Sequence, residues 1–224
     1  METPAENKII DTVVAYLNEH REAKRFLNLG AGRSVVLENK LANRGCAARC
    51  DRVDIDDCTV NHPGVDNCYV CSAESMTPVA SEAYDVVFSN YVLEHIEDIN
   101  STAREIVRVL KPGGIFVASI PNPRAPEFMV AKHTPFWFHR FVRGGTGWHT
   151  VYAFPSVRAL TEILSGAGLE ALEIAYYPIA RQYFERWRPL VWLASIYDGL
   201  VGVVGWRSLM GNVCLVHRKP IGNS

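Results

Sequence analysis

The sequence has no excess of charge of either sign. Its 224 residues contain 23 Lys and Arg against 24 Asp and Glu, which gives a formal net charge of −1. A chain without a basic excess has no global field that holds nucleic acid or an anionic membrane by charge alone, so we expect no nucleic-acid partner. The hydrophobic share is 48%, and this predicts a single globular domain over residues 1–224 with a buried core.

Internal repeats, low-complexity tracts and an apolar leader are also missing. The lack of a fixed repeat period excludes solenoid architectures. The start, Met1–Lys8, is polar and no apolar h-region follows it, which is not the pattern of a secretion signal. We therefore expect a cytoplasmic protein whose six cysteines are free thiols.

Five of the cysteines fall between Cys46 and Cys71, with His62 among them, so a zinc site has to be considered. Cys68 and Cys71 have zinc-like spacing, but they lie on a predicted strand, where residues three apart point to opposite faces. No second Cys-x-x-Cys follows. We therefore expect buried or idle thiols and no metal.

Apolar periodicity predicts alternating helices and strands. An amphipathic helix runs to about His20, and further helices are predicted at 34–43, 101–110 and 155–166. Strands are predicted at 25–29, 50–55, 67–71, 84–88, 115–120, 169–176 and 212–217. This alternation predicts a doubly wound, Rossmann-like α/β fold with a seven-stranded, mostly parallel sheet. The last strand is expected to be an antiparallel C-terminal edge strand.

Two segments depart from this alternation. Residues 122–153 are rich in proline and aromatic side chains, and we expect them to form a lid over an acceptor site. Residues 185–207 are an apolar helical segment whose core, 189–206, barely reaches spanning length and contains Asp198. Two readings stay open for it: a helix packed in the core or at a subunit contact, or an interfacial helix that makes peripheral membrane contact.

A glycine turn, Gly30-Ala31-Gly32, follows the strand 25–29. Two glycines separated by one residue let the backbone turn tightly and approach a ligand without a Cβ in the way. A dinucleotide-binding turn needs a third glycine at the position of Val35, so a nucleotide-dependent oxidoreductase is disfavoured. The turn keeps space for a cofactor that carries no phosphate.

Asp54 lies 22 residues after Gly32, at the end of the next predicted strand. A carboxylate at this position can accept hydrogen bonds from both ribose hydroxyls of an adenosine. Asp56 and Asp57 compete with it for this role.

Four blocks, in this order, resemble the class I S-adenosylmethionine-dependent methyltransferases of the small-molecule and lipid type. The blocks are Leu27–Gly32, Val53–Asp56, Cys71–Pro78 with Tyr84–Ile96, and Arg108–Gly114. The resemblance implies S-adenosylmethionine as cofactor and transfer of its methyl group to a small-molecule or lipid-like acceptor.

The resemblance also implies a set of cofactor-binding residues. The backbone of Gly30, Ala31 and Gly32 would border the methionine moiety, and Asp54 would hold the ribose. The adenine edge would meet Ser72 and Ala73, and the amino acid end would lie beside Asn90 and Tyr91.

Two of these positions depart from the family pattern. Asn28 stands where the family often has an acid; its amide can hydrogen-bond a cofactor ammonium but adds no charge attraction. Ser72 stands where Asp often meets the adenine amino group. These departures leave open a catalytically inactive member of the fold that serves as a binding or assembly subunit.

Methyl transfer from a sulfonium needs alignment above all, and a general base helps only when the acceptor must lose a proton. The candidate base is His149, close in sequence to the polar Tyr152, where the insert 122–153 returns to the sheet. The other histidines considered, with structural roles favoured for them, are His95, His133 and His139. Two roles stay open for the aromatic side chains of the insert: they bind an apolar acceptor, or they close the core.

Overall fold

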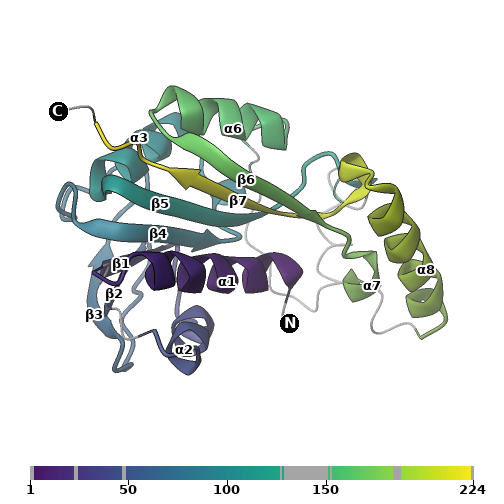
Figure 1. Ribbon diagram of the computed structural model, residues 1–224, viewed down its shortest axis with the longest axis horizontal. Helices are drawn as coiled ribbons and strands as arrows, with labels where there is room; N and C mark the ends of the chain where they lie inside the picture. The colour runs from purple at the N-terminus through teal and green to yellow at the C-terminus, as the bar shows by residue number, and fades with distance from the viewer. Residues whose placement is uncertain are drawn as a thin grey trace.

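The computed structural model describes residues 3–22, 25–46, 49–126, 128, 151, 153–183 and 188–222. These residues form one seven-stranded sheet in the order β3-β2-β1-β4-β5-β7-β6. Strands β1 to β5 pair in parallel, and β7 is antiparallel to both of its neighbours. Helices cover both faces of the sheet, with α1 on one and α3 and α6 on the other (Figure 1). The doubly wound, mostly parallel α/β fold is thereby confirmed.

The first half of the chain supplies the strands on one side of the sheet. Its elements are α1 (Pro4–Glu19), β1 (Arg25–Leu29), α2 (Val36–Asn43), β2 (Arg49–Asp54) and β3 (Val65–Val70). Helix α1 starts at the N-cap Thr3, whose hydroxyl accepts a hydrogen bond from the Glu6 amide at 3.1 Å. Ile9 and Val13 are fully buried, so the apolar stripe of α1 packs on the sheet.

The middle of the chain continues the alternation. Its elements are β4 (Tyr84–Asn90), η1 (Leu93–His95), α3 (Ile99–Val109), β5 (Leu110–Pro121), α6 (Val157–Gly166) and β6 (Glu170–Tyr177). Strand β5 begins directly after α3, so the Lys111–Gly114 segment that ends the helix belongs to the strand, and the register with β4 shifts between Tyr84 and Val86.

The C-terminal elements are α7 (Ala180–Tyr183), α8 (Arg188–Val204), η2 (Arg207–Leu209) and β7 (Asn212–Arg218). Strand β7 is antiparallel, as expected, but the prediction that it lies at the edge is wrong: it lies between β5 and β6, and β6 is the edge strand. Six of its seven residues are buried, as suits a strand inside the sheet, whereas the first four residues of β6 are exposed.

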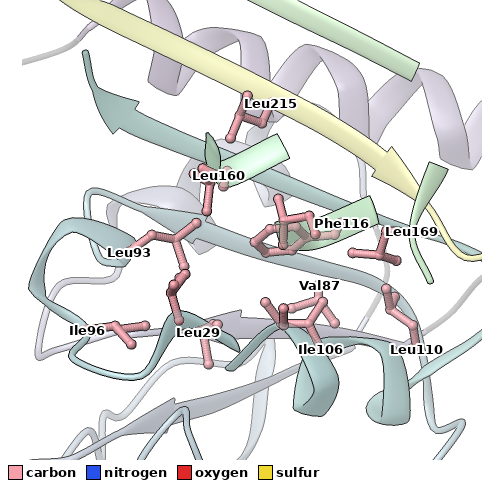
Figure 2. Close-up of a cluster of buried hydrophobic side chains, with 14 of the residues drawn as sticks. Leu29, Val87, Leu93, Ile96, Ile106, Leu110, Phe116, Leu160, Leu169 and Leu215 are labelled. Atoms are coloured by element: carbon pink, nitrogen blue, oxygen red, sulfur yellow. The ribbon is translucent and has the colours of Figure 1, made fainter. Parts of the chain in front are cut away.

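The core consists of two apolar layers, one on each face of the sheet. Figure 2 shows the layer between the sheet and helices α3 and α6, where Phe116 lies among Val87, Ile106 and Leu169. The next residue along β5, Val117, belongs to the layer beneath α1, because successive side chains of a strand point to opposite faces.

Helix α8 packs on α7 at one end of the molecule (Figure 1). Within the described part of the chain, no helix is both long and apolar enough to cross a bilayer. Most of the expected lid, residues 122–153, lies outside the described residues. At its start, the side-chain amide of Asn122 donates to the carbonyl oxygens of Arg207 and Met210 at 3.0 and 2.9 Å, which joins the end of β5 to the segment before β7.

Candidate functional site

The glycine turn lies at the carboxyl end of β1. Gly30 and Gly32 have φ angles of +71° and +54°, a region that residues with a side chain rarely adopt. A Cβ on Gly30 would lie 2.3 Å from a methyl carbon of Val92, so only glycine lets Val92 pack against the turn. A Cβ on Gly32 would meet nothing within 4 Å. The turn is therefore closed behind Gly30 and open beside Gly32.

Asp54, at the end of β2, is hydrogen-bonded to this turn. Its Oδ2 accepts from the Gly32 amide at 2.7 Å, and its Oδ1 accepts from the Asp56 amide at 3.0 Å. Asp56 and Asp57 are exposed, and Asp57 accepts from the Thr59 amide instead. Of the three competing carboxylates, Asp54 is the one bonded to the glycine turn, and each of its oxygens keeps further lone pairs for ligand hydroxyls.

A buried arginine supports the same turn from below. The Nη2 of Arg52, whose side chain is fully buried, donates to the carbonyl oxygens of Ala31, Gly32 and Ser34 at 2.9, 3.3 and 2.6 Å. Its Nε lies 3.4 Å from Oε1 of Glu38, which also accepts from the Asn28 side chain at 2.8 Å. The pair of Arg52 and Glu38 was not predicted from the sequence, although a charged residue in the interior of a predicted strand is a signal for a buried ion pair.

The segment expected at the adenine edge follows β3. The Cys71 amide donates to the Asp54 carbonyl oxygen at 2.9 Å, and this places Ser72 and Ala73 next to the end of β2. The Ser72 hydroxyl accepts from the Glu74 amide at 3.1 Å, in a local turn.

Asn90 and Tyr91 lie at the end of β4. Tyr91 has a φ of +56°, and its amide donates to the Ser119 carbonyl oxygen at 3.0 Å. Its hydroxyl donates to the Thr3 hydroxyl at 3.0 Å and accepts a hydrogen bond from Asn212. Tyr91 therefore joins the start of α1 and the start of β7 to the end of β4.

A cavity of about 650 Å³ lies between α1, α2 and the ends of β1 and β4. Four of the predicted cofactor residues line it: Asn28, Gly30, Ala31 and Asn90. The other lining residues are Glu6, Ser34, Val36, Leu37, Glu38 and Lys40. The predicted residues Gly32, Asp54, Ser72, Ala73 and Tyr91 do not line this cavity. The volume is in the range of a small-molecule site, and Glu6, Glu38 and Lys40 give it charges of both signs.

These features fit an adenosine cofactor that carries a charged amino acid. Asp54 offers a carboxylate to a ribose, the turn at Gly32 has open space, and the polar cavity offers both charges that a zwitterionic end needs. The individual contacts with the cofactor stay predictions.

The candidate base is not tested by the structure. His149, His133, His139 and Tyr152 lie outside the described residues. His95 lies in η1, with its Nε2 4.0 Å from a carboxylate oxygen of Glu94. All six cysteines are free thiols, and the described residues contain no group of three or more His, Cys, Asp or Glu side chains arranged to hold a metal.

Comparison with known proteins finds similar methyltransferases. A family model described as a methyltransferase domain matches residues 27–118. The ubiquinone biosynthesis O-methyltransferase of Saccharophagus degradans is 29% identical over 183 residues, which cover 75% of each chain. A probable S-adenosylmethionine-dependent methyltransferase of Mycolicibacterium smegmatis is 35% identical over 129 residues, covering 55% of this chain and 44% of that protein.

Solved structures share the fold. The [4+2]-cyclase SpnF superposes with a TM-score of 0.60 at 22% identity, covering 95% of this chain and 81% of that one. The geranyl diphosphate C-methyltransferase of Streptomyces coelicolor, solved with S-adenosyl-L-homocysteine, gives a TM-score of 0.55 at 16% identity, covering 93% and 77%.

The methyltransferase domain that matches residues 27–118 and the similarity to S-adenosylmethionine-dependent methyltransferases indicate a methyltransferase with S-adenosylmethionine as its cofactor.

Proposed function

We propose that the protein transfers the methyl group of S-adenosylmethionine to an oxygen atom of a small lipophilic molecule. The observation that carries the proposal is the hydrogen bond from the Gly32 amide to the Asp54 carboxylate, at a turn that is open on the side of Gly32. This bond supports the proposal because it joins the two proposed parts of a phosphate-free adenosine site within the segment that the methyltransferase domain matches.

In this proposal, different residues bind different parts of the cofactor. Asp54 accepts from the ribose hydroxyls, Ser72 and Ala73 meet the adenine edge, and the backbone of 30–32 borders the methionine moiety. Asn90 and Tyr91 lie beside the amino acid end. When bound, the cofactor supplies a methyl group already activated on a sulfonium, so the chain has to align the acceptor and exclude water.

The proposed class of acceptor is inferred from the names of relatives and from the aromatic composition of the segment 122–153. Several relatives are named as ubiquinone biosynthesis O-methyltransferases. The segment 122–153, which we propose as the lid, contains Phe128, Phe136, Trp137, Phe138, Phe141 and Trp148. An aromatic lid suits a lipophilic acceptor. A hydroxyl acceptor has to lose its proton, and we propose His149 as the base that takes it.

We also propose that α8 rests on a lipid surface. Its outward side chains are apolar: Trp192, Leu200 and Val203 are 67%, 62% and 89% exposed. Asp198 does not interrupt this surface, because its carboxylate accepts from the amides of Ala180 and Arg181 at 2.9 and 2.8 Å and so caps α7. The exposed Trp206 and Arg207 follow the helix, and this combination is typical of interfacial helices.

Vesicle co-sedimentation tests the lipid contact. We expect the protein to bind vesicles of mixed phosphatidylcholine and phosphatidylglycerol, and the double variant Trp192→Ser, Leu200→Ser to lose about tenfold or more of that binding. Val70→Ser is the matched control, since Val70 is 59% exposed on β3. Equal binding by both variants would contradict the contact.

An assay with S-adenosylmethionine that carries a labelled methyl group tests the reaction. We expect transfer of the labelled methyl group to phenols that carry an apolar tail, weaker transfer to the same phenols without the tail, and loss of transfer in His149→Ala. Methylation confined to amine or carbon acceptors would contradict O-methylation.

A further inference from the structure

Two charged side chains that line the cavity are paired with each other. Glu6 comes from the first turn of α1 and Lys40 from the last turn of α2, and both line the cavity together with Asn90. Glu6 is only 7% exposed. A carboxylate this deeply buried needs partners of opposite charge or hydrogen-bond donors to remain ionised.

Glu6 has such partners on both of its oxygens. Its Oε1 is paired with Nζ of Lys40, and its Oε2 accepts from the side-chain amide of Asn90 at 3.3 Å. Lys40 also donates to Oδ1 of Asn7 at 3.3 Å. The pair is therefore held by α1 and by the end of β4, at the place where the amino acid end of the cofactor is proposed to lie.

Glu38, the other acidic residue that lines the cavity, is paired with a residue outside it. Glu38 lies 3.4 Å from the buried guanidinium of Arg52, and the Asn28 amide donates to it at 2.8 Å. Its charge is thereby balanced inside the protein. Asn28 itself carries no charge, so the position that is often acidic in this class offers no charge to a cofactor ammonium. Glu6 and Lys40 are the charged lining residues that are paired with each other, whereas Glu38 is paired with Arg52.

We propose that Glu6 and Lys40 form the receptor for the amino acid end of the cofactor, Glu6 binding its ammonium and Lys40 its carboxylate. This inference rests on the proposed cofactor site. In the free protein the two side chains neutralise each other, and a zwitterion inserted between them replaces one ion pair by two. Lysine is suited to this exchange, because its ammonium sits on a flexible stem and has three donors.

Calorimetry with three ligands tests the proposal. S-adenosylhomocysteine carries both charges, its deaminated analogue lacks the ammonium, and 5′-methylthioadenosine lacks the amino acid end altogether. We expect Glu6→Gln and Lys40→Met to weaken S-adenosylhomocysteine about 10- to 100-fold and to leave methylthioadenosine unchanged within about twofold. Glu6→Gln should also leave the deaminated analogue nearly unchanged.

The matched controls come from the ion pair of Lys8 and Glu173, which joins α1 to β6 at 2.8 Å away from the cavity lining. Lys8→Met and Glu173→Gln should bind S-adenosylhomocysteine as the wild type does. Equal weakening of S-adenosylhomocysteine and methylthioadenosine in Glu6→Gln would show a structural role and overturn the proposal, as would unchanged affinity for all three ligands. A wild type that binds none of the three would instead overturn the cofactor site itself, and this inference with it.

Discussion

The guanidinium of Arg52 donates a 2.6 Å hydrogen bond to the carbonyl oxygen of Ser34, directly behind the glycine turn. The same nitrogen contacts the carbonyl oxygens of Ala31 and Gly32. Charge-assisted hydrogen bonds of this kind are about twice as strong as neutral ones. The turn is therefore shaped by β2, and its conformation is preorganised for a ligand.

Arg52→Lys should destabilise the fold. A lysine has one nitrogen at the end of a single stem and cannot reproduce the fork that reaches both the turn and Glu38. The charge is kept, but buried acceptors on the turn or on Glu38 lose their donor, and we expect a loss of about 1–3 kcal/mol in the free energy of unfolding, measured by urea titration.

Arg49→Lys is the control for that variant, because Arg49 pairs with Asp66 on the surface and is 73% exposed. We expect it to change stability by less than about 1 kcal/mol. Similar stabilities for the two variants would show that Arg52 does not support the turn.

Gly30→Ala and Gly32→Ala should differ in their effect. Both place alanine at a positive φ, which costs about 1–2 kcal/mol. Only Gly30→Ala also drives a methyl group into Val92, so we expect it to lose clearly more stability than Gly32→Ala in thermal unfolding. Combining Gly30→Ala with Val92→Ala should recover part of the difference. A larger loss for Gly32→Ala would contradict the geometry of the turn.

His217 should make stability depend on pH. It is fully buried on β7, neither ring nitrogen has a hydrogen-bond partner in the described structure, and burial lowers its pKa to about 4. Above about pH 6.5 the ring is neutral in both the folded and the unfolded chain. As the pH falls from about 6.5 to about 4, His217 binds a proton in the unfolded chain but not in the folded protein, so stability is lost.

This contribution amounts to about 2 kcal/mol between about pH 7.5 and about pH 5, measured by urea unfolding at both values. His217→Leu should remove that share of the pH dependence while the carboxylates titrate as before. An unchanged pH dependence in His217→Leu would mean that the ring is protonated or hydrated in the folded state.

The sequence predicts those parts of the fold that depend on local pattern. The strand 25–29 is a short, mostly apolar segment that ends at a glycine turn, and β1 has these same bounds. The position of β7 could not be predicted in this way, because the pattern of a strand identifies its buried faces and not its neighbours. Only burial on both faces, together with the exposed start of β6, distinguishes the inner strand from the edge.

For the site, the motifs predict the turn and Asp54, whereas the residues that support them depend on tertiary contacts. Glu6 comes three and four residues before Ile9 and Ile10, on the stripe of α1 that is buried. A carboxylate on an apolar stripe is a usable signal, but its partner Lys40 is 34 positions away and comes near only when α1 packs beside α2. Spacing alone cannot show this.

The role of Asp54 gives the most direct test of the cofactor site. Calorimetry with S-adenosylhomocysteine should show tight binding by the wild type, a loss of about 100-fold or more in Asp54→Ala, and affinity within about twofold of wild type in Asp56→Ala. Asp54→Ala binding as tightly as the wild type would contradict the account.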